Sequence, residues 1–208
     1  INICGNLVLY FFQFDVGNEG AYSIFAAVAF AAQVLVMMIV PALRRKYTKN
    51  QLFIFGFIIQ IVGFLLILVM AYTNLYSPKT WFILCIPGIM IYLGYGMLNV
   101  IMTIFLSDSV DYGEVKNATR DESVIFSMQT FTVKLASGLA VFLAGLVVDW
   151  INLDTTVKVQ SAKTLTGLRL WMTVPAIILL VIGIFVYKSR YKLDDKKMEE
   201  IKKQLDQK

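Results

Sequence analysis

Hydrophobic residues in this chain occur in long, almost unbroken runs, and short segments rich in polar residues separate them. Six runs stand out within residues 1–192: residues 1–14, 21–43, 51–72, 81–106, 123–148 and 170–187. A membrane core about 30 Å thick requires roughly 20 apolar residues in a helix, and all the runs except the first approach or exceed that length. The pattern therefore predicts an all-α membrane protein with six transmembrane helices in one bundle.

The first run, residues 1–14, is too short to cross a membrane by itself and begins with the first residue of the chain. It has no initiator methionine, no basic leading segment and no small-residue cleavage site, so it does not resemble a signal peptide. We therefore expect the chain to start inside a helix and to be the later part of a longer protein.

The composition supports a membrane location and excludes several kinds of chemistry. Apolar residues make up 58% of the 208 residues and charged residues 16%, and the mean hydropathy is +0.70. The chain has no histidine, which excludes histidine-ligated metals and nucleophiles activated by histidine. Cys4 and Cys85 lie inside apolar runs, so we expect neither a disulfide framework nor a zinc site. We also expect no enzyme, because no acidic residue or histidine lies within the runs to act with a lysine.

The positions of the basic residues predict the orientation in the membrane. The net charge of +5 comes from lysine and arginine concentrated after the second and fourth runs and in the C-terminal tail. Because such residues favour the cytoplasmic side, we expect residues 193–208 to form a cytoplasmic tail. The positive charge then follows from topology and does not indicate nucleic-acid binding. Met198, Ile201 and Leu205 share one helical face, which predicts a short amphipathic helix in the tail.

Lys134 is the most informative residue, because it lies near the middle of the fifth run. An ammonium group at the centre of a helix in lipid costs about 2.5–3.5 kcal/mol, and Lys134 lies about 16 Å along the helix from Ser123, at 1.5 Å per residue. The acidic residues all lie at the ends of the runs or in the tail. We therefore expect the anionic partner of Lys134 in a missing part of the protein or in a ligand. A lysine that only folds onto backbone carbonyls is the alternative.

Polar and small residues surround the predicted position of Lys134. Thr130 and Gly138 share its helical face, and Gln129 lies next to them. The first run has a polar stripe of its own, formed by Asn2, Asn6, Tyr10 and Gln13. We expect this stripe to line a cavity, with hydrogen bonds between buried helices as the alternative. The fourth run adds Asn99, which follows a glycine-rich segment typical of helices that bend in transporters.

The segment after the fourth run carries charges at regular positions. Asp108, Asp111 and Glu114 follow one another at steps of three, and Arg120 and Glu122 come after them. Three carboxylates could suggest calcium, but the glycine and the ligand spacing of an EF-hand are absent. We therefore expect these groups to form ion pairs with the basic ends of other helices.

Taken together, these residues resemble a known family. The segments that carry the resemblance are Asp108-x-x-Asp111-Tyr112-Gly113-Glu114-x-Lys116, Arg120-x-Glu122 and Gln129-Thr130-x-x-x-Lys134. They are similar to the glycoside–pentoside–hexuronide:cation symporters, the melibiose-carrier branch of the major facilitator superfamily. The resemblance extends over the whole chain and implies that it is the C-terminal six-helix half of a twelve-helix carrier.

The resemblance also implies a function. Such a protein is a secondary active transporter in the plasma (inner) membrane that carries a sugar or glycoside together with Na⁺ or H⁺ by alternating access, without another cofactor. Its N-terminal half would be the partner of this chain, would hold most of the cation site, and would supply the carboxylates that face Lys134. A carrier of amphiphilic, lipid-like solutes on the same fold is the alternative.

Two sets of residues would then carry the function. For the substrate site we expect Gln129, Thr130, Lys134, Asn99 and Asn6, with Lys134 also coupling the cation to the substrate. For the cytoplasmic gate we expect Asp108, Asp111, Glu114, Arg120 and Glu122.

Overall fold

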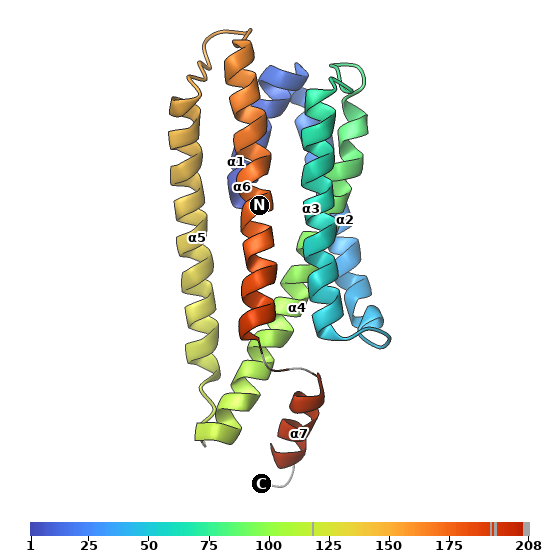
Figure 1. Cartoon of the computed structure of the whole chain (residues 1–208), viewed down its shortest axis with the longest axis vertical. Helices are drawn as coiled ribbons and strands as arrows, with labels where there is room; N and C mark the ends of the chain where they lie inside the picture. The colour runs from blue at the N-terminus through green and yellow to red at the C-terminus, as the bar shows by residue number, and fades with distance from the viewer. Residues whose placement is uncertain (118, 192, 194, 206–208) are drawn as a thin grey trace.

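A computed structural model describes residues 1–117, 119–191, 193 and 195–205, and this part of the chain consists of helices joined by short connections (Figure 1). The elements in chain order are α1 (Asn2–Tyr10), a π-helical segment η1 (Phe11–Val16), α2 (Glu19–Leu43), α3 (Lys49–Tyr72), a 3₁₀ turn η2 (Trp81–Leu84), α4 (Cys85–Asn117), α5 (Glu122–Trp150), α6 (Ala162–Arg190) and α7 (Asp195–Leu205).

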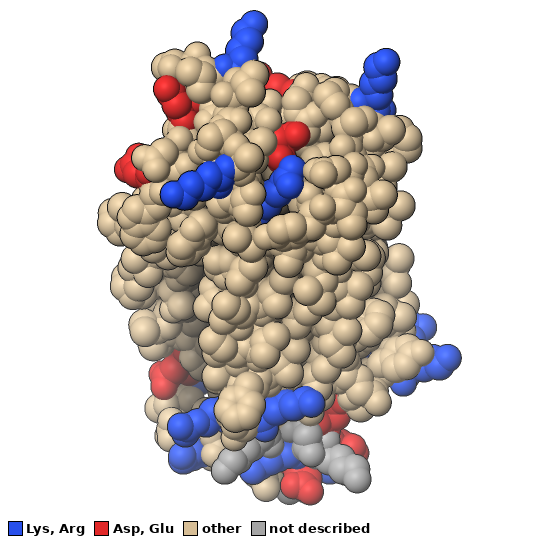
Figure 2. Space-filling model, turned by 45° about the horizontal axis from the view of Figure 1, so that its top comes forward, with Lys and Arg blue, Asp and Glu red and all other residues tan. Residues whose placement is uncertain are grey.

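Five of the described helices are long and apolar enough to cross a membrane: α2, α3, α4 with η2, α5 and α6. On the face drawn in Figure 2, a broad band without charged residues separates two charged ends. The predicted all-helical, multi-pass membrane protein is therefore confirmed. We call the end that carries α7 and the α2–α3 connection the α7 end, and the other the opposite end.

The helix starts follow the capping signals in the sequence. Asn18 accepts a hydrogen bond from the N–H of Ala21 at the start of α2. Thr48 and Gln51 form a reciprocal capping box at the start of α3. At the end of η1, Gly17 has a φ of 75°, a left-handed conformation that glycine adopts without a steric penalty. These signals set α2 and α3 close to the predicted boundaries.

Two predicted boundaries differ from the structure. α4 continues past residue 106 to Asn117, so the charged segment is the last part of a long helix and not a connection. α6 starts at Ala162, because Ser161 accepts a hydrogen bond from the N–H of Thr164 and caps it, whereas the sixth predicted run starts only at residue 170. A run defined by hydropathy stops at the first charged residues, but charged residues do not interrupt the backbone hydrogen bonds of a helix, so the helix can extend beyond the run.

The closest helix packing joins α4 to α2 and α3. A Cβ atom on Gly94 would lie 2.5 Å from the carbonyl oxygen of Gly56 in α3, and one on Gly96 would lie 2.8 Å from that of Gln33 in α2. Only glycine allows backbones to approach this closely, as is common between membrane helices. The three helices therefore form a tightly packed group.

Most residues of α5 are exposed, and the helix stands at the edge of the bundle in Figure 1. Of its residues only Ala140, Ala144 and Val147 are buried, all in the half of the helix nearer the opposite end. The preceding residues, from Glu122 to Leu139, are exposed or half-buried. The described part of the chain therefore leaves one face of α5 without a packing partner.

Candidate functional site

A polar cleft of about 360 Å³ lies between α1, α4 and α5. Its polar lining consists of Asn2 and Asn6 from α1, Tyr92 and Tyr95 from α4, and Ser137 from α5. The Asn2 amide donates to the Ser137 hydroxyl at 3.1 Å and links α1 to α5. The cleft thus combines amide, hydroxyl and phenol groups with two aromatic rings, a mixture suited to a hydroxyl-rich ligand.

One of the five predicted substrate residues lines this cleft, and the other four do not. Asn6 lines the cleft, and its amide donates to the Asn2 carbonyl at 2.9 Å. Asn99 lies one turn beyond Tyr95 on α4, where its amide donates to the Tyr95 carbonyl at 2.9 Å. Its side chain is half-buried and does not line the cleft.

The α5 wall of the cleft continues along the helix toward Lys134. Ser137 follows Lys134 by three residues and Thr130 by seven, so the three side chains share one helical face. The Thr130 hydroxyl donates to the Phe126 carbonyl at 2.9 Å, which leaves its oxygen lone pairs available as acceptors. Gln129 is half-buried, and its amide has no hydrogen-bond partner among the described residues.

Lys134 is exposed and forms neither an ion pair nor a hydrogen bond with any residue that the structure describes. In the described part of the chain, Lys134 therefore does not fold onto backbone carbonyls, which was the alternative. A Cβ atom on Gly138 or Gly145 would have no neighbouring atom within 4 Å. No other helix that the structure describes approaches these glycines, so the face around Lys134 is left uncovered by the described residues.

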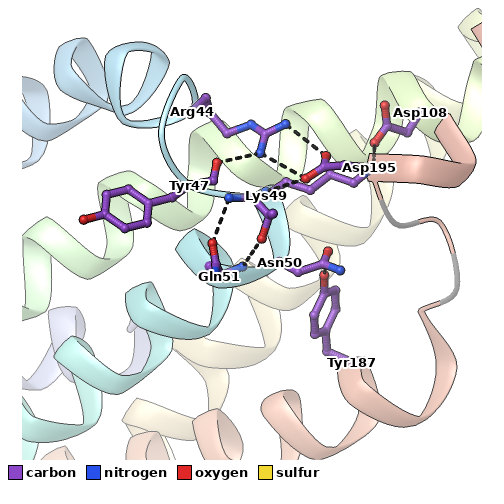
Figure 3. A network of polar contacts seen from close by, with 9 residues as sticks. Arg44, Tyr47, Lys49, Asn50, Gln51, Asp108, Tyr187 and Asp195 are labelled. Carbon is purple, nitrogen blue, oxygen red and sulfur yellow. Dashed lines mark hydrogen bonds and ion pairs between the residues drawn. The ribbon is translucent and has the colours of Figure 1, made fainter. Parts of the chain in front are cut away.

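The charged residues of the predicted gate divide into two groups at the α7 end. The Asp108 carboxylate pairs with Nζ of Lys49 at the start of α3 (Figure 3), and the two side chains are only 9% and 1% exposed. The rings of Phe105 and Tyr191 lie 5.9 and 5.7 Å from the same ammonium. The expected ion pair with the basic end of another helix is confirmed for Asp108.

The second group is an exposed cluster around Arg120. Its guanidinium lies 2.7 Å from Glu114, 3.4 Å from Glu122 and 3.5 Å from Asp111. The hydrogen bond with Glu114 raises the pKa of Arg120. Asp108 therefore pairs with Lys49 of α3, whereas Asp111, Glu114 and Glu122 contact Arg120 in the α4–α5 connection.

A further ion pair attaches α7 to the rest of the bundle. The Arg44 guanidinium contacts the Asp195 carboxylate at 3.0 Å, and the backbone N–H of Lys49 donates to the same carboxylate at 3.3 Å (Figure 3). Met198 and Ile201 of α7 are buried. The predicted amphipathic tail helix is therefore confirmed, and it packs on the bundle through its apolar face.

The opposite end contains an ion pair that the sequence did not reveal. The Arg169 guanidinium holds Asp15 through contacts of 2.7 and 3.0 Å and donates to the Ala71 carbonyl at 2.8 Å. The Tyr76 phenol also donates to Asp15, whose side chain is only 1% exposed. Burial and this hydrogen bond raise the pKa of Tyr76, so it remains a neutral donor. The network joins η1, α3, the α3–η2 connection and α6.

Comparison with known proteins decides the family. The sequence model of the family described as MFS/sugar transport protein matches residues 1–195. The chain belongs to this family. It is 27% identical over 207 residues to an uncharacterised symporter of Bacillus subtilis, covering 100% of this chain and 43% of that protein.

Two further relatives of this sugar transport family have names that state a sugar. The raffinose carrier protein of Pediococcus pentosaceus is 25% identical over 209 residues, which cover 99% of this chain and 31% of that carrier. The isoprimeverose transporter of Lactiplantibacillus pentosus is 26% identical over 185 residues, 88% of this chain and 37% of that transporter. The chain thus spans less than half the length of these relatives.

Sequence reasoning missed part of the polar cleft in this member of the family. Tyr92 and Tyr95 are three residues apart, which places them on one face of α4, and Ser137 lies three residues after Lys134. This spacing could have indicated from the sequence that these side chains belong to the same polar faces. The contact between Asn2 and Ser137, 135 residues apart, had no such local signal.

Proposed function

We propose that this chain is the C-terminal six-helix half of a cation-coupled symporter for a sugar or glycoside, with α1 and η1 forming part of the first of the six helices. The observation that supports this most is the uncovered face of α5, where Lys134 lies beside a polar cleft in a member of a sugar transport family. The names of the raffinose and isoprimeverose relatives support a sugar as substrate.

The uncovered face supports a partner half. Lys134 has no anion among the described residues, and Gly138 and Gly145 have free space above them. An N-terminal half placed there would cover the polar face and supply carboxylates to Lys134. Binding of Na⁺ or H⁺ at those carboxylates would release them from Lys134, and this exchange would couple the ion to the substrate.

The substrate would bind between the halves against the α1–α4–α5 wall. On α5 it would contact Gln129, Thr130 and Lys134. Asn6 and Asn99 would contact it from α1 and α4. The rings of Tyr92 and Tyr95 offer apolar faces for the C–H groups of a sugar, and their phenols have no hydrogen-bond partner among the described residues.

Alternating access would require a gate at each end. We place the α7 end in the cytoplasm of a cell whose plasma (inner) membrane holds the carrier, because basic residues are concentrated in the α2–α3 connection and the tail. The exposed Arg120 cluster, with Asp111, Glu114 and Glu122, is then positioned to exchange ion pairs with the other half. The buried Lys49–Asp108 pair would stay within this half as it moves.

The decisive experiment measures transport by the full-length protein in proteoliposomes. Labelled glycosides should accumulate when a Na⁺ or H⁺ gradient is imposed and should only equilibrate when the gradient is collapsed. A labelled lysophospholipid serves as the second substrate. Gradient-driven uptake of the lysophospholipid without uptake of any glycoside would replace the proposal with an amphiphile carrier.

Thr130→Val tests the substrate site. This variant keeps the shape of the side chain and removes its hydroxyl, so a bound sugar loses one hydrogen bond, at a cost of about 1–3 kcal/mol. The dissociation constant measured by equilibrium binding should rise roughly 5- to 100-fold.

Thr132→Val is the matched control. The Thr132 hydroxyl also donates to a backbone carbonyl one turn earlier, that of Met128 at 2.8 Å, but it faces away from Thr130 on the helix. Its sugar affinity should match the parent. Equal affinities in the Thr130 and Thr132 variants would remove Thr130 from the site.

A further inference from the structure

A second, larger cleft lies at the α7 end, away from the polar cleft. It has a volume of about 490 Å³ and lies between the α2–α3 connection, α4 and α7. Basic residues line it from three places: Arg44, Arg45 and Lys46 in the α2–α3 connection, Lys49 at the start of α3, and Lys202 on α7. The function proposed above does not use this cleft.

The charges in the cleft do not balance. Three carboxylates line it, and each already has a cation: Asp108 pairs with Lys49, Asp195 with Arg44, and Glu199 with Lys203. Arg45, Lys46 and Lys202 are exposed and have no carboxylate partner among the residues that the structure describes. Three uncompensated positive groups therefore face one space and favour an anionic ligand.

An apolar surface leads directly to these basic groups. Leu35, Met38 and Ile39 on the last turns of α2 are 58%, 73% and 51% exposed, and the connection that carries Arg45 and Lys46 begins after Leu43. Tyr47, which also lines the cleft, is 42% exposed. A ligand that fits both surfaces is amphiphilic, with an anionic head at the end of a hydrocarbon chain.

We propose that this cleft binds the headgroup of an anionic phospholipid, with its acyl chains against the exposed face of α2. Basic pockets at the ends of membrane helices bind such headgroups, because each lysine or arginine near the surface adds attraction to the lipid phosphate. Inorganic phosphate could meet the same basic groups but could not use the apolar face of α2. The inference requires only that the chain spans a membrane, so it does not depend on sugar transport.

The test is lipid binding to the purified full-length protein in neutral detergent, followed by native mass spectrometry. Phosphatidylglycerol and phosphatidylcholine with identical acyl chains are compared, and inorganic phosphate is added as a competitor. The parent should bind phosphatidylglycerol more tightly than phosphatidylcholine, and an equal concentration of phosphate should not displace it. The double variant Arg45→Ala/Lys46→Ala should bind phosphatidylglycerol roughly thirtyfold more weakly.

Two further variants test whether a loss of affinity comes from the cleft or from the loss of positive charge in general. Lys188→Ala/Arg190→Ala removes the same charge from the exposed end of α6, outside the cleft, and should change the affinity less than threefold. The single variant Lys202→Ala, at an exposed position of α7, should weaken binding about fivefold. The proposal is wrong if both lipids bind equally, if phosphate competes at equal concentration, if the cleft variants bind like the parent, or if the α6 variant loses as much affinity as the double variant.

Discussion

Replacing Lys134 by alanine should abolish accumulation of a transported sugar by the full-length carrier in the presence of a cation gradient. In the proposed carrier the ammonium of Lys134 neutralises carboxylates of the other half, and the variant would leave them buried without a cation. Breaking a buried ion pair in this way typically costs about 3–5 kcal/mol. Concentrative uptake into proteoliposomes, measured with and without the gradient, checks the result.

The fold of this chain should survive the Lys134→Ala substitution. Lys134 is exposed and has no partner among the residues that the structure describes, so its removal breaks no ion pair within this chain. Expression and the melting temperature therefore serve as internal checks on folding. Lys163→Ala, which removes an exposed lysine at the start of α6, is the matched control and should accumulate sugar like the parent. Parental accumulation by the Lys134 variant would contradict the coupling role.

Replacing Arg169 by alanine should strongly lower the free energy of unfolding. The guanidinium joins three elements of the opposite end through Asp15 and the Ala71 carbonyl. Asp15 is only 1% exposed, so the variant leaves a buried carboxylate whose remaining side-chain partner is the Tyr76 phenol. The free energy of unfolding should fall by about 3–5 kcal/mol. Thermal unfolding followed by tryptophan fluorescence in detergent reports the change as a lower melting temperature.

Two comparisons separate this buried pair from an ordinary surface arginine. Arg120→Ala removes an arginine that also contacts carboxylates but is 53% exposed, and exposed pairs contribute about 0–1 kcal/mol. Its melting temperature should stay close to that of the parent. The double variant Asp15→Leu/Arg169→Met removes both charges and should be more stable than Arg169→Ala. Equal melting temperatures for the two single variants would show that the Asp15 network contributes little.

The positions of the helices could be predicted because hydropathy and capping are local properties of the sequence. α2 and α3 lie close to the predicted runs, and the amphipathic tail helix was found from the spacing of three apolar residues. The prediction of helix ends was less accurate where charged residues lie inside a helix and not at its end. α4 extends through Asp108, Asp111 and Glu114 because its backbone bonds continue, and one of these carboxylates finds its cation on α3.

The candidate site, too, could be predicted only in part. The depth of Lys134 and the absence of acidic residues inside the runs were visible in the sequence, because both depend only on position along a helix. The cleft between Asn6, the two tyrosines of α4 and Ser137 was not, since it depends on which helices are neighbours.

By itself, therefore, the sequence determined that this protein is helical, crosses a membrane, and carries a lone lysine deep in one helix. Only the tertiary structure decided the pairing of its charges. Asp15 lies 154 residues from Arg169, and Arg44 lies 151 residues from Asp195. The basic residues of the chain outnumber the acidic ones, so composition cannot say which cation each carboxylate meets. An ion pair forms only where packing brings two side chains within about 4 Å of each other, and that distance is set by the way the helices cross.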